Sequence, residues 1–232
     1  CGLNPVIIEL MKNKVITAIS LNGAGAIHDF EVALIGRTSE DVPEALEDGS
    51  FGMAKETALY INGALEEAVE KDIGAGQAIG EVINDEKLSF RNKSLLYNAL
   101  EEDILATVHI AIGTDIIHQH PSFDAGAAGE ASLKDFHRLI EEVSMLGDGG
   151  VALNIGSSVL LPEVFLKAIN VARNLGYKVK DFTACNFDMI SHYRPYQNVV
   201  TRPVKSGGKG YNIIGQHEIM LPLLGQAVIE KI

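Results

Sequence analysis

The sequence predicts an α/β protein in which a parallel β-sheet is covered by helices on both faces, giving three layers. Apolar runs rich in β-branched residues alternate with amphipathic helical segments along the chain. Short turns containing glycine separate the two kinds of segment, and strand–turn–helix units at this spacing connect parallel strands. Because no repeat, low-complexity tract or linker interrupts the pattern, residues 1–232 are predicted to form one domain.

The apolar periodicity assigns an element to most of the chain. Asn4 is expected to cap the first helix, Ser132 a later one, and Gly36 and Gly176 to end helices. The predicted strands are 15–21, 106–115, the start of 149–176, and 178–187. The predicted helices are 4–14, 26–36, those within 38–72 around an acidic loop at 47–49, 94–105, 132–146, the end of 149–176, and 216–232.

The composition narrows the classes of partner. A formal net charge of −12 argues against nucleic acid or an anionic membrane as the main partner, and suits a cationic substrate such as a polyamine. No apolar run approaches the roughly 20 residues that span a bilayer. Cys1 and Cys185 form neither a disulfide framework nor a zinc pattern, so a reducing, cytoplasmic location is expected. Because the chain begins with Cys, we expect that an N-terminal piece is missing.

Ligands of open parallel sheets bind beyond the carboxyl ends of the strands, which makes the turns at 22–26, 113–120, 155–158 and 184–191 candidate sites. In the first turn, Gly23 and Gly25 would let a pyrophosphate approach the main chain, and Asp29 would bind a ribose hydroxyl. The dinucleotide motif G-x-G-x-x-G is only partly met, because His28 stands at the third glycine. The alternative is a tight bend between a strand and a helix.

The second turn places Asp115 after a strand and puts His118 and His120 two residues apart. If the segment is extended, both imidazoles share a face and could converge on one ligand or metal. His217 and Glu218 would complete such a site only if the fold brings the last helix there. The alternative is that these histidines form local hydrogen bonds or face solvent.

The remaining turns are rich in small and polar residues. The Gly156-Ser157-Ser158 turn could approach a ligand, while Glu163 either stabilises the dipole of the next helix or joins a site. Cys185 has no base adjacent in sequence, so a buried structural thiol is expected. Lys205, beside a glycine pair, could form an imine if desolvated, or could lie in a solvated loop. Polar side chains crowd the segment after 178–187, namely Asn186, Asp188, Ser191, His192 and Arg194.

Taken together, these turns resemble the deoxyhypusine synthase family over nearly the whole chain. The first turn stands in the place of the family's Thr-Ala-Gly-Gly-hydrophobic-Glu-Glu-Asp motif, and 183–188 closely matches its Thr-Ala-x-x-Phe-Asp segment. The matching segments, in chain order, are Gly23–Asp29, Thr114-Asp115, Ile155–Ser157, Thr183–Asp188, Arg194-Pro195 and Pro222–Leu224. Six segments in the same order are more specific than any one of them.

The resemblance implies a Rossmann-like fold, an NAD cofactor and a homotetramer with active sites between paired subunits. It also implies chemistry in which NAD oxidises spermidine, an enzyme lysine carries the aminobutyl group as an imine, and the group passes to an acceptor amine. That acceptor is a protein lysine in deoxyhypusine synthases and a small diamine in related homospermidine synthases. The missing N-terminal piece would hold the first strand and serines of the cofactor site.

The resemblance also implies a role for individual residues, with no metal assigned. Lys205 would be the imine-forming catalytic lysine. Substrate-binding positions would be His118, His120, Glu163, Ser191 and Gln197. Cofactor-binding positions would be Asn22, Gly23, Ala24, Gly25, Asp29, Thr114, Asp115, Gly156, Ala184, Asp188, Gln216 and His217.

The chain departs from the family on the substrate side. The ungapped match to the family's Trp-Gly-Lys lysine falls at Arg202-Pro203, and Lys205 reaches it only if the loop gains one or two residues. His120, Ser191 and Gln197 stand where acids would bind the polyamine, Pro162 or Glu163 where a histidine is expected, and Thr201 in place of a tryptophan. Two alternatives therefore remain: a metal enzyme using His118, His120 and His217, and a non-catalytic nucleotide-binding protein.

Overall fold

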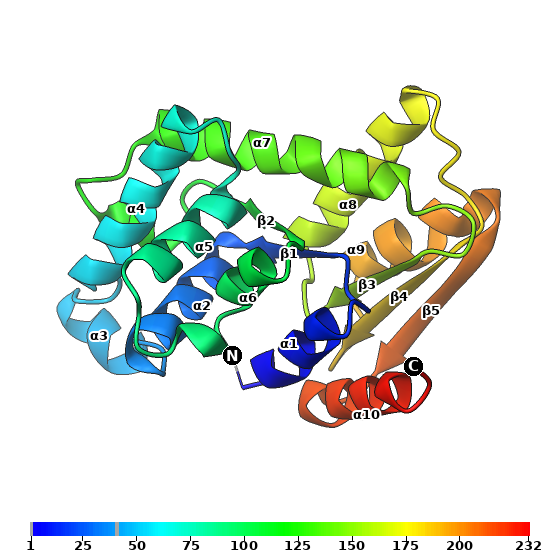
Figure 1. Ribbon diagram of the computed structural model, residues 1–232, viewed down its shortest axis with the longest axis horizontal. Coiled ribbons are helices and arrows are strands. Elements are labelled where there is room, and N and C mark those ends of the chain that lie inside the picture. The colour runs from blue at the N-terminus through cyan, green and yellow to red at the C-terminus, as the bar shows by residue number, and fades with distance from the viewer. Residues whose placement is uncertain (1, 40–41) are drawn as a thin grey trace. The chain divides into compact units, whose positions relative to one another are not determined.

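The computed structural model describes residues 2–39 and 42–232, and the chain forms two compact units, 2–135 and 136–232 (Figure 1). Each unit contains parallel strands and helices, so the predicted α/β class is confirmed. The strands form a two-stranded and a three-stranded sheet. A single Rossmann-like domain stays a prediction, and Cys1 and residues 40–41 lie outside the described part.

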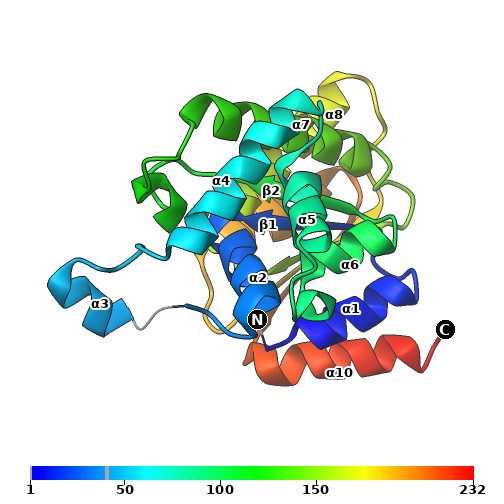
Figure 2. The ribbon, with the colours of Figure 1, turned by 60° about the vertical axis from the view of Figure 1, so that its left-hand side comes forward.

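The first unit is built on two parallel strands, β1 (Ala18–Asn22) and β2 (Leu105–His109), with Asn22 opposite His109. Several helices gather around these strands (Figure 2). They are α1 (Asn4–Lys12), α2 (Gly23–Ile35), α3 (Val42–Asp48), α4 (Lys55–Glu70), α5 (Ala75–Asp85), α6 (Leu95–Glu101) and the start of α7 (Ala125–Ser144), with the short 3-10 turns η1 (Arg91–Lys93) and η2 (Ile116–Gln119). Phe30, Ile61, Leu65, Ile79 and Val108 form part of one buried core.

Buried carboxylates hold the starts of two of these helices. Asp29, only 3% exposed, accepts hydrogen bonds from the main-chain N–H groups of Leu95 (2.7 Å) and Leu96 (3.0 Å) at the start of α6. It also accepts from the Ser94 hydroxyl and the Asn4 amide. The first turn of a helix has N–H groups without intrahelical partners, so each such carboxylate satisfies donors that burial would otherwise leave unpaired.

Asp135 likewise accepts a hydrogen bond at the start of α5. Its Oδ2 accepts from the N–H groups of Gly76 (2.8 Å) in α5 and Val108 (2.7 Å) in β2. The residue is fully buried, and its carboxylate joins a helix, a strand and α7 at one point. The position of α5 against β2 therefore depends on one side chain distant in sequence from both.

The second unit carries the parallel sheet β3-β4-β5, formed by Val151–Ile155, Phe182–Asp188 and Gly208–Ile214. The core of this unit contains Phe182, Ala184 and Val199, which pack with Ala168 and Ile169 of α8. The helical elements are the end of α7, α8 (Leu160–Asn174), α9 (Tyr193–Pro195), the π-helical η3 (Tyr196–Thr201), the 3-10 turn η4 (Pro203–Ser206) and α10 (His217–Ile229).

Several predicted boundaries are wrong. Leu3, rather than Asn4, occupies the N-cap of α1, because the Asn4 amide is used inside the protein by Asp29. Ser132 lies within α7 and exchanges hydrogen bonds with β2: its Oγ accepts from Ile110 N and donates to Val108 O. Helix α5 is absent from the prediction, and β5 replaces a predicted loop. Gly36 ends α2 in a left-handed conformation (φ 78°), as expected.

In the described part of the chain, no helix is both long enough and apolar enough to cross a membrane.

We expect Gly76→Ala to destabilise the protein, because a Cβ there would overlap the main-chain oxygen of Ala106. The expected loss in the free energy of unfolding is about 2–4 kcal/mol, typical of overpacking against a rigid backbone. Gly63→Ala in α4 is the matched control, because no atom lies within 4 Å of its added Cβ. The free energy of unfolding of Gly63→Ala should rise by about 0.5–1 kcal/mol. Urea unfolding of both variants measures the difference, and equal effects would contradict the close packing of α5.

Candidate functional sites

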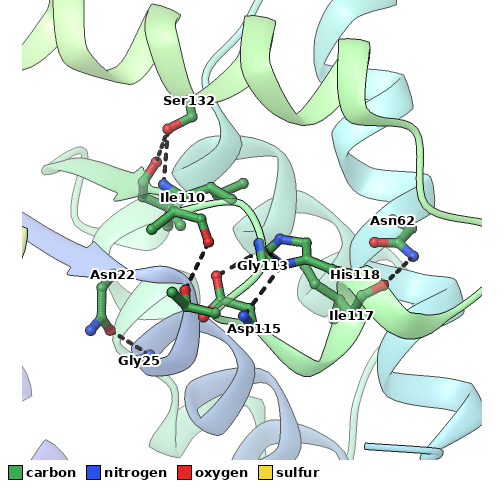
Figure 3. A network of polar contacts seen from close by, with 12 residues as sticks. Asn22, Gly25, Asn62, Ile110, Gly113, Asp115, Ile117, His118 and Ser132 are labelled. Carbon is green, nitrogen blue, oxygen red and sulfur yellow. Dashed lines mark hydrogen bonds and ion pairs between the residues drawn. The ribbon is translucent and has the colours of Figure 1, made fainter.

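The first candidate site lies where β1 passes into α2 (Figure 3). Asn22 ends β1 and caps α2, its Oδ1 accepting from Gly25 N at 2.7 Å. A Cβ on Gly23 would overlap Oδ2 of Asp115, so glycine is needed there for the carboxylate to approach. Asp115 also accepts from the main-chain N–H of Ala24. A side chain of the same chain therefore occupies the start of α2.

His118 is held against Asp115 by its own loop. Its Nδ1 accepts from the main-chain N–H groups of Gly113 (3.1 Å) and Asp115 (3.2 Å), while Asp115 accepts from the N–H of His118 (Figure 3). Because Nδ1 is an acceptor, the neutral ring carries its proton on Nε2. This Nε2 lies 3.9 Å from Oδ2 of Asp115. Both atoms are buried without a hydrogen-bond partner in the described residues.

Burial sets the electrostatics of this pair. Desolvation raises the pKa of Asp115, and it outweighs the opposing effects of His118, Thr114 and the Ala24 amide. A carboxylate that is buried with one oxygen unpaired destabilises the folded state. An arrangement that reduces stability in this way is typical of a functional site.

The geometry changes the expected roles of the first turn. Gly23, Ala24 and Gly25 are predicted to receive a pyrophosphate, but here they admit the Asp115 carboxylate, whose negative charge opposes a phosphate at the same place. Asn22 is engaged as a helix cap. Asp29 lies in the core beneath α6 with both oxygens bonded internally, so it does not line a ligand site.

The histidines of this loop do not form a joint metal site. The segment is a 3-10 turn rather than an extended strand, and His120 Nδ1 pairs with the Ser122 hydroxyl at 2.8 Å. Thr114 donates to Ala111 O at 2.8 Å. Within residues 2–39 and 42–232, no group of three or more His, Cys, Asp and Glu side chains is placed to hold a metal ion. The three-histidine alternative therefore has no support from the described residues.

His109 is a buried residue that the sequence does not single out. It ends β2 opposite Asn22 and is only 4% exposed, with its ring nitrogen 3.0 Å from the Thr107 hydroxyl. Burial lowers its pKa to about 4, so the ring is neutral at physiological pH. A histidine in a run such as "LATVHIAI" has the pattern of a buried strand residue, so no local signal distinguishes it.

The second candidate site lies at the carboxyl ends of β3 and β4 in the second unit. Gly156 follows β3 with φ of 68°, and its N–H donates to Phe187 O at 3.0 Å. His217, at the start of α10, places Nε2 3.2 Å from the same oxygen, and its ring would contact a Cβ on Gly156 at 3.3 Å. Gln216 caps α10 without a side-chain hydrogen bond to it. The structure therefore brings Gly156 together with His217, which follows Gln216 in sequence, so that two of the segments predicted to bind the cofactor lie side by side.

Asp188 ends β4 at the same edge. Its Oδ1 accepts from Met189 N at 2.7 Å, whereas Oδ2 is buried and has no hydrogen-bond partner in the described residues. The basic atom that faces Oδ2 is Nε2 of His192, at 4.0 Å. Ser191, between them in sequence, is exposed, and its Oγ accepts from the Asn212 amide at 3.4 Å.

Three asparagines cross the sheet behind this edge. Asn154, Asn186 and Asn212 are register partners on β3, β4 and β5. The Asn154 amide donates to Ser157 O (2.9 Å) and to Asn186 Oδ1 (2.7 Å), and Asn186 donates to Asn212 Oδ1 (2.8 Å). Because a carbonyl only accepts, Ser157 fixes the direction of the whole chain of hydrogen bonds. This asparagine ladder links the loop after β3 to Ser191 after β4.

Three other predicted site residues, and the cysteine expected to be structural, lie elsewhere in the second unit. Ala184 is fully buried in the core beneath the sheet. Glu163 on α8 bonds to Lys167 and Asn198, and the Lys167 ammonium lowers its pKa, so its role is in a surface network. Gln197 is half-buried in η3. Cys185 is buried, which raises the pKa of its thiol and fits the expected structural role.

Lys205 lies at the wrong edge of the sheet for the predicted role. It is exposed in η4, which immediately precedes β5, whereas Asp188, Gly156 and His217 lie beyond the carboxyl ends of the parallel strands. β5 has seven residues, so the two edges are separated by about 20 Å. Arg173 fixes η4 by donating to Pro203 O and to the Ser206 hydroxyl. Lys205 is therefore not part of this site.

No family model and no curated protein sequence matches this chain. The likeness to deoxyhypusine synthase thus rests on the ordered segments in the sequence.

We expect Asp115→Asn to stabilise the protein by about 1 kcal/mol at neutral pH, because it removes a buried charge and keeps the shape of the side chain. The raised pKa of Asp115 means that the folded state holds the proton more tightly than the unfolded chain. The wild-type protein therefore loses stability as pH rises through that pKa. The extra stability of Asp115→Asn over the wild-type protein should accordingly vanish as pH falls toward 4. Urea unfolding across this pH range measures it.

Asp29→Asn is the matched control, because Asp29 is also buried beside a helix start but has both oxygens bonded. Its free energy of unfolding should fall by about 2–4 kcal/mol, because the NH2 group that replaces one carboxylate oxygen cannot accept from the donors that this oxygen now satisfies. An Asp115→Asn loss as large as that of Asp29→Asn would show that the Asp115 carboxylate serves the fold alone.

Proposed function

We propose that this protein is an NAD-dependent enzyme of the deoxyhypusine synthase type, with a Rossmann-like fold, that acts on a polyamine or a related amine. The observation that carries the proposal is the buried pair of Asp115 Oδ2 and His118 Nε2, both without partners among the described residues, at the start of α2. A carboxylate at the end of a parallel strand is the usual partner of a nucleotide ribose in such folds.

The chemistry of the pair fits a hydroxyl group. A hydroxyl donates one hydrogen bond and accepts others, so it can donate to the carboxylate of Asp115 and accept from Nε2–H of His118. A phosphate does not fit, because it would bring a second negative charge to the carboxylate. Both atoms are covered by their own loop, so binding requires 113–120 to move, and the left-handed Gly113 (φ 91°) is a candidate hinge.

The second unit offers the features suited to an amine. The buried carboxylate of Asp188 has a free oxygen among the described residues, and the net charge of −12 favours a cationic substrate over an anionic one. When bound, NAD would accept a hydride from the donor amine and later return it. Gly156, Gln216 and His217 are the residues of this unit that we assign to the cofactor. The resemblance adds a homotetramer and an acceptor amine, free or on a protein lysine.

The position of Lys205 favours a second candidate, a protein that binds NAD without transferring an aminobutyl group. With Lys205 at the opposite edge of the sheet, the imine-forming lysine of the family has no counterpart at the carboxyl edge of the second unit, whose residues 136–232 are all described. Tight binding of NAD without turnover of any polyamine would support this candidate over the enzyme.

We expect Asp115→Asn and His118→Gln to weaken NAD binding at least tenfold, since a hydrogen bond to a charged group contributes about 1.5–3 kcal/mol. Isothermal titration calorimetry with NAD measures the affinities. Asp181→Asn is the control, because Asp181 is an exposed carboxylate beside Lys180 and should leave the affinity unchanged. If the wild-type protein binds no NAD, or if all three variants bind alike, the assignment of Asp115 fails.

We further expect Lys205→Ala to keep wild-type turnover of spermidine with NAD, because Lys205 is exposed and lies away from the carboxyl edge. Release of 1,3-diaminopropane, followed by mass spectrometry, measures turnover. Lys209→Ala, a second exposed lysine nearby, serves as the control. A loss of more than about a hundredfold for Lys205→Ala alone would return Lys205 to the mechanism, as expected when a covalent nucleophile is removed.

A further inference from the structure

Asp188, whose carboxylate is proposed above to suit an amine, lies beside His192, which has no part in the proposed function so far. Asp188 is only 5% exposed, and its Oδ2 has no hydrogen-bond partner in the described residues. His192 is four residues on, with 38% of its side chain exposed, and its Nε2 faces that oxygen at 4.0 Å. The two atoms are within ion-pair distance and form no hydrogen bond.

The charged side chains near this pair are bound to other partners. Of the elements packed against α9, α8 carries Glu163 and Lys167, which bind each other, and Arg173, which donates to Pro203 O. The π-helical η3 carries no Asp, Glu, Lys, Arg or His. Arg194 pairs with Glu163, and Arg202 donates to Asn198 and Tyr193. His217 is turned to Phe187 O. Among the residues that the structure describes, Asp188 is therefore the one anion within ion-pair distance of His192.

The asparagine ladder holds the loop that carries the pair. Asn212 donates to Ser191 Oγ, and Ser191 adjoins His192. The other end of the ladder is bound to Ser157 O after β3. A loop anchored to the sheet through side chains limits the positions that His192 can take, which is what an acid–base group needs.

We propose that His192 accepts a proton from the amine substrate, with Asp188 as its positioning residue; this inference rests on the proposed function. If the proton of the neutral ring is on Nε2, which lies 4.0 Å from Asp188 Oδ2, Nδ1 keeps its lone pair. The N–H bond of a substrate ammonium breaks, the proton moves to Nδ1, and the electron pair stays on the amine nitrogen. The imidazolium is stabilised by the Asp188 carboxylate and then releases its proton to water.

The pair can be tested without substrate or cofactor by following each histidine ring of the full chain with NMR as pH is varied. In the wild-type protein, we expect neutral His192 to carry its proton on Nε2, the ring nitrogen that lies 4.0 Å from Asp188 Oδ2. Asp188→Asn should abolish this preference between the two ring nitrogens, because it removes the carboxylate that favours a proton on Nε2. His217 provides an internal reference.

Asp181→Asn is the matched control, since it removes the same charge just before the other end of β4 and should leave the proton of neutral His192 on Nε2. An equal change in both variants, or none in Asp188→Asn, overturns the pair. Should Asp188→Asn fail to fold, a wild-type proton on Nδ1 also overturns it.

Turnover of spermidine with NAD then separates this inference from the proposed function. We expect His192→Gln to lower kcat at least tenfold, and Asp188→Asn to lower it as well, because the imidazolium loses the carboxylate that stabilises it. If the position of the ring proton changes as expected but the wild-type protein turns over no polyamine, the pair stands and the proposed function fails. If turnover occurs and His192→Gln leaves it unchanged, the role of His192 is overturned while the function stands.

Discussion

The first unit depends on carboxylates that are buried at the starts of helices. Asp29 serves α6, Asp135 serves α5, and Asp115 serves α2. Each comes from a segment distant in sequence from at least one group that it binds, so these contacts define tertiary structure as well as capping helices. The N–H groups at a helix start carry partial positive charge, and burying them requires an acceptor. The placement of the helices around β1 and β2 follows from where these acids lie.

The carboxylates differ in whether both of their oxygens accept hydrogen bonds. This difference distinguishes a structural residue from a candidate site residue. Asp29 has hydrogen bonds to both oxygens, and its surroundings are those of a structural residue. Asp115 has the same kind of position, yet Oδ2 faces a His118 Nε2 that is equally unpaired among the described residues. Buried polar atoms are nearly always satisfied in folded proteins, and the proposed role of Asp115 rests on this exception.

The sequence predicted most elements because periodicity and glycine turns are local signals, as at α2 with Gly36. It missed β5, since "GGKGYNII" opens with glycines that resemble a loop and is a strand only because it pairs with β4. It singled out Asp115 and Asp188 from their positions at the ends of strands, and their role as site residues stays a prediction. It assigned Asp29 wrongly, because spacing cannot show that a carboxylate points inward to Ser94. It could not see the asparagine ladder, which depends on register across three strands.

The position of Lys205 shows that a match to a sequence motif does not by itself place a catalytic side chain at the correct edge of a sheet. The family's lysine must face the same edge as the cofactor, and in a parallel sheet that edge is set by strand direction. Because η4 precedes β5, moving Lys205 by one or two residues along the loop cannot carry it to the other end of a seven-residue strand. Any proton transfer at the carboxyl edge of this unit therefore falls to groups that follow strands, and among these His192 has both a buried carboxylate beside it and a ring open to solvent.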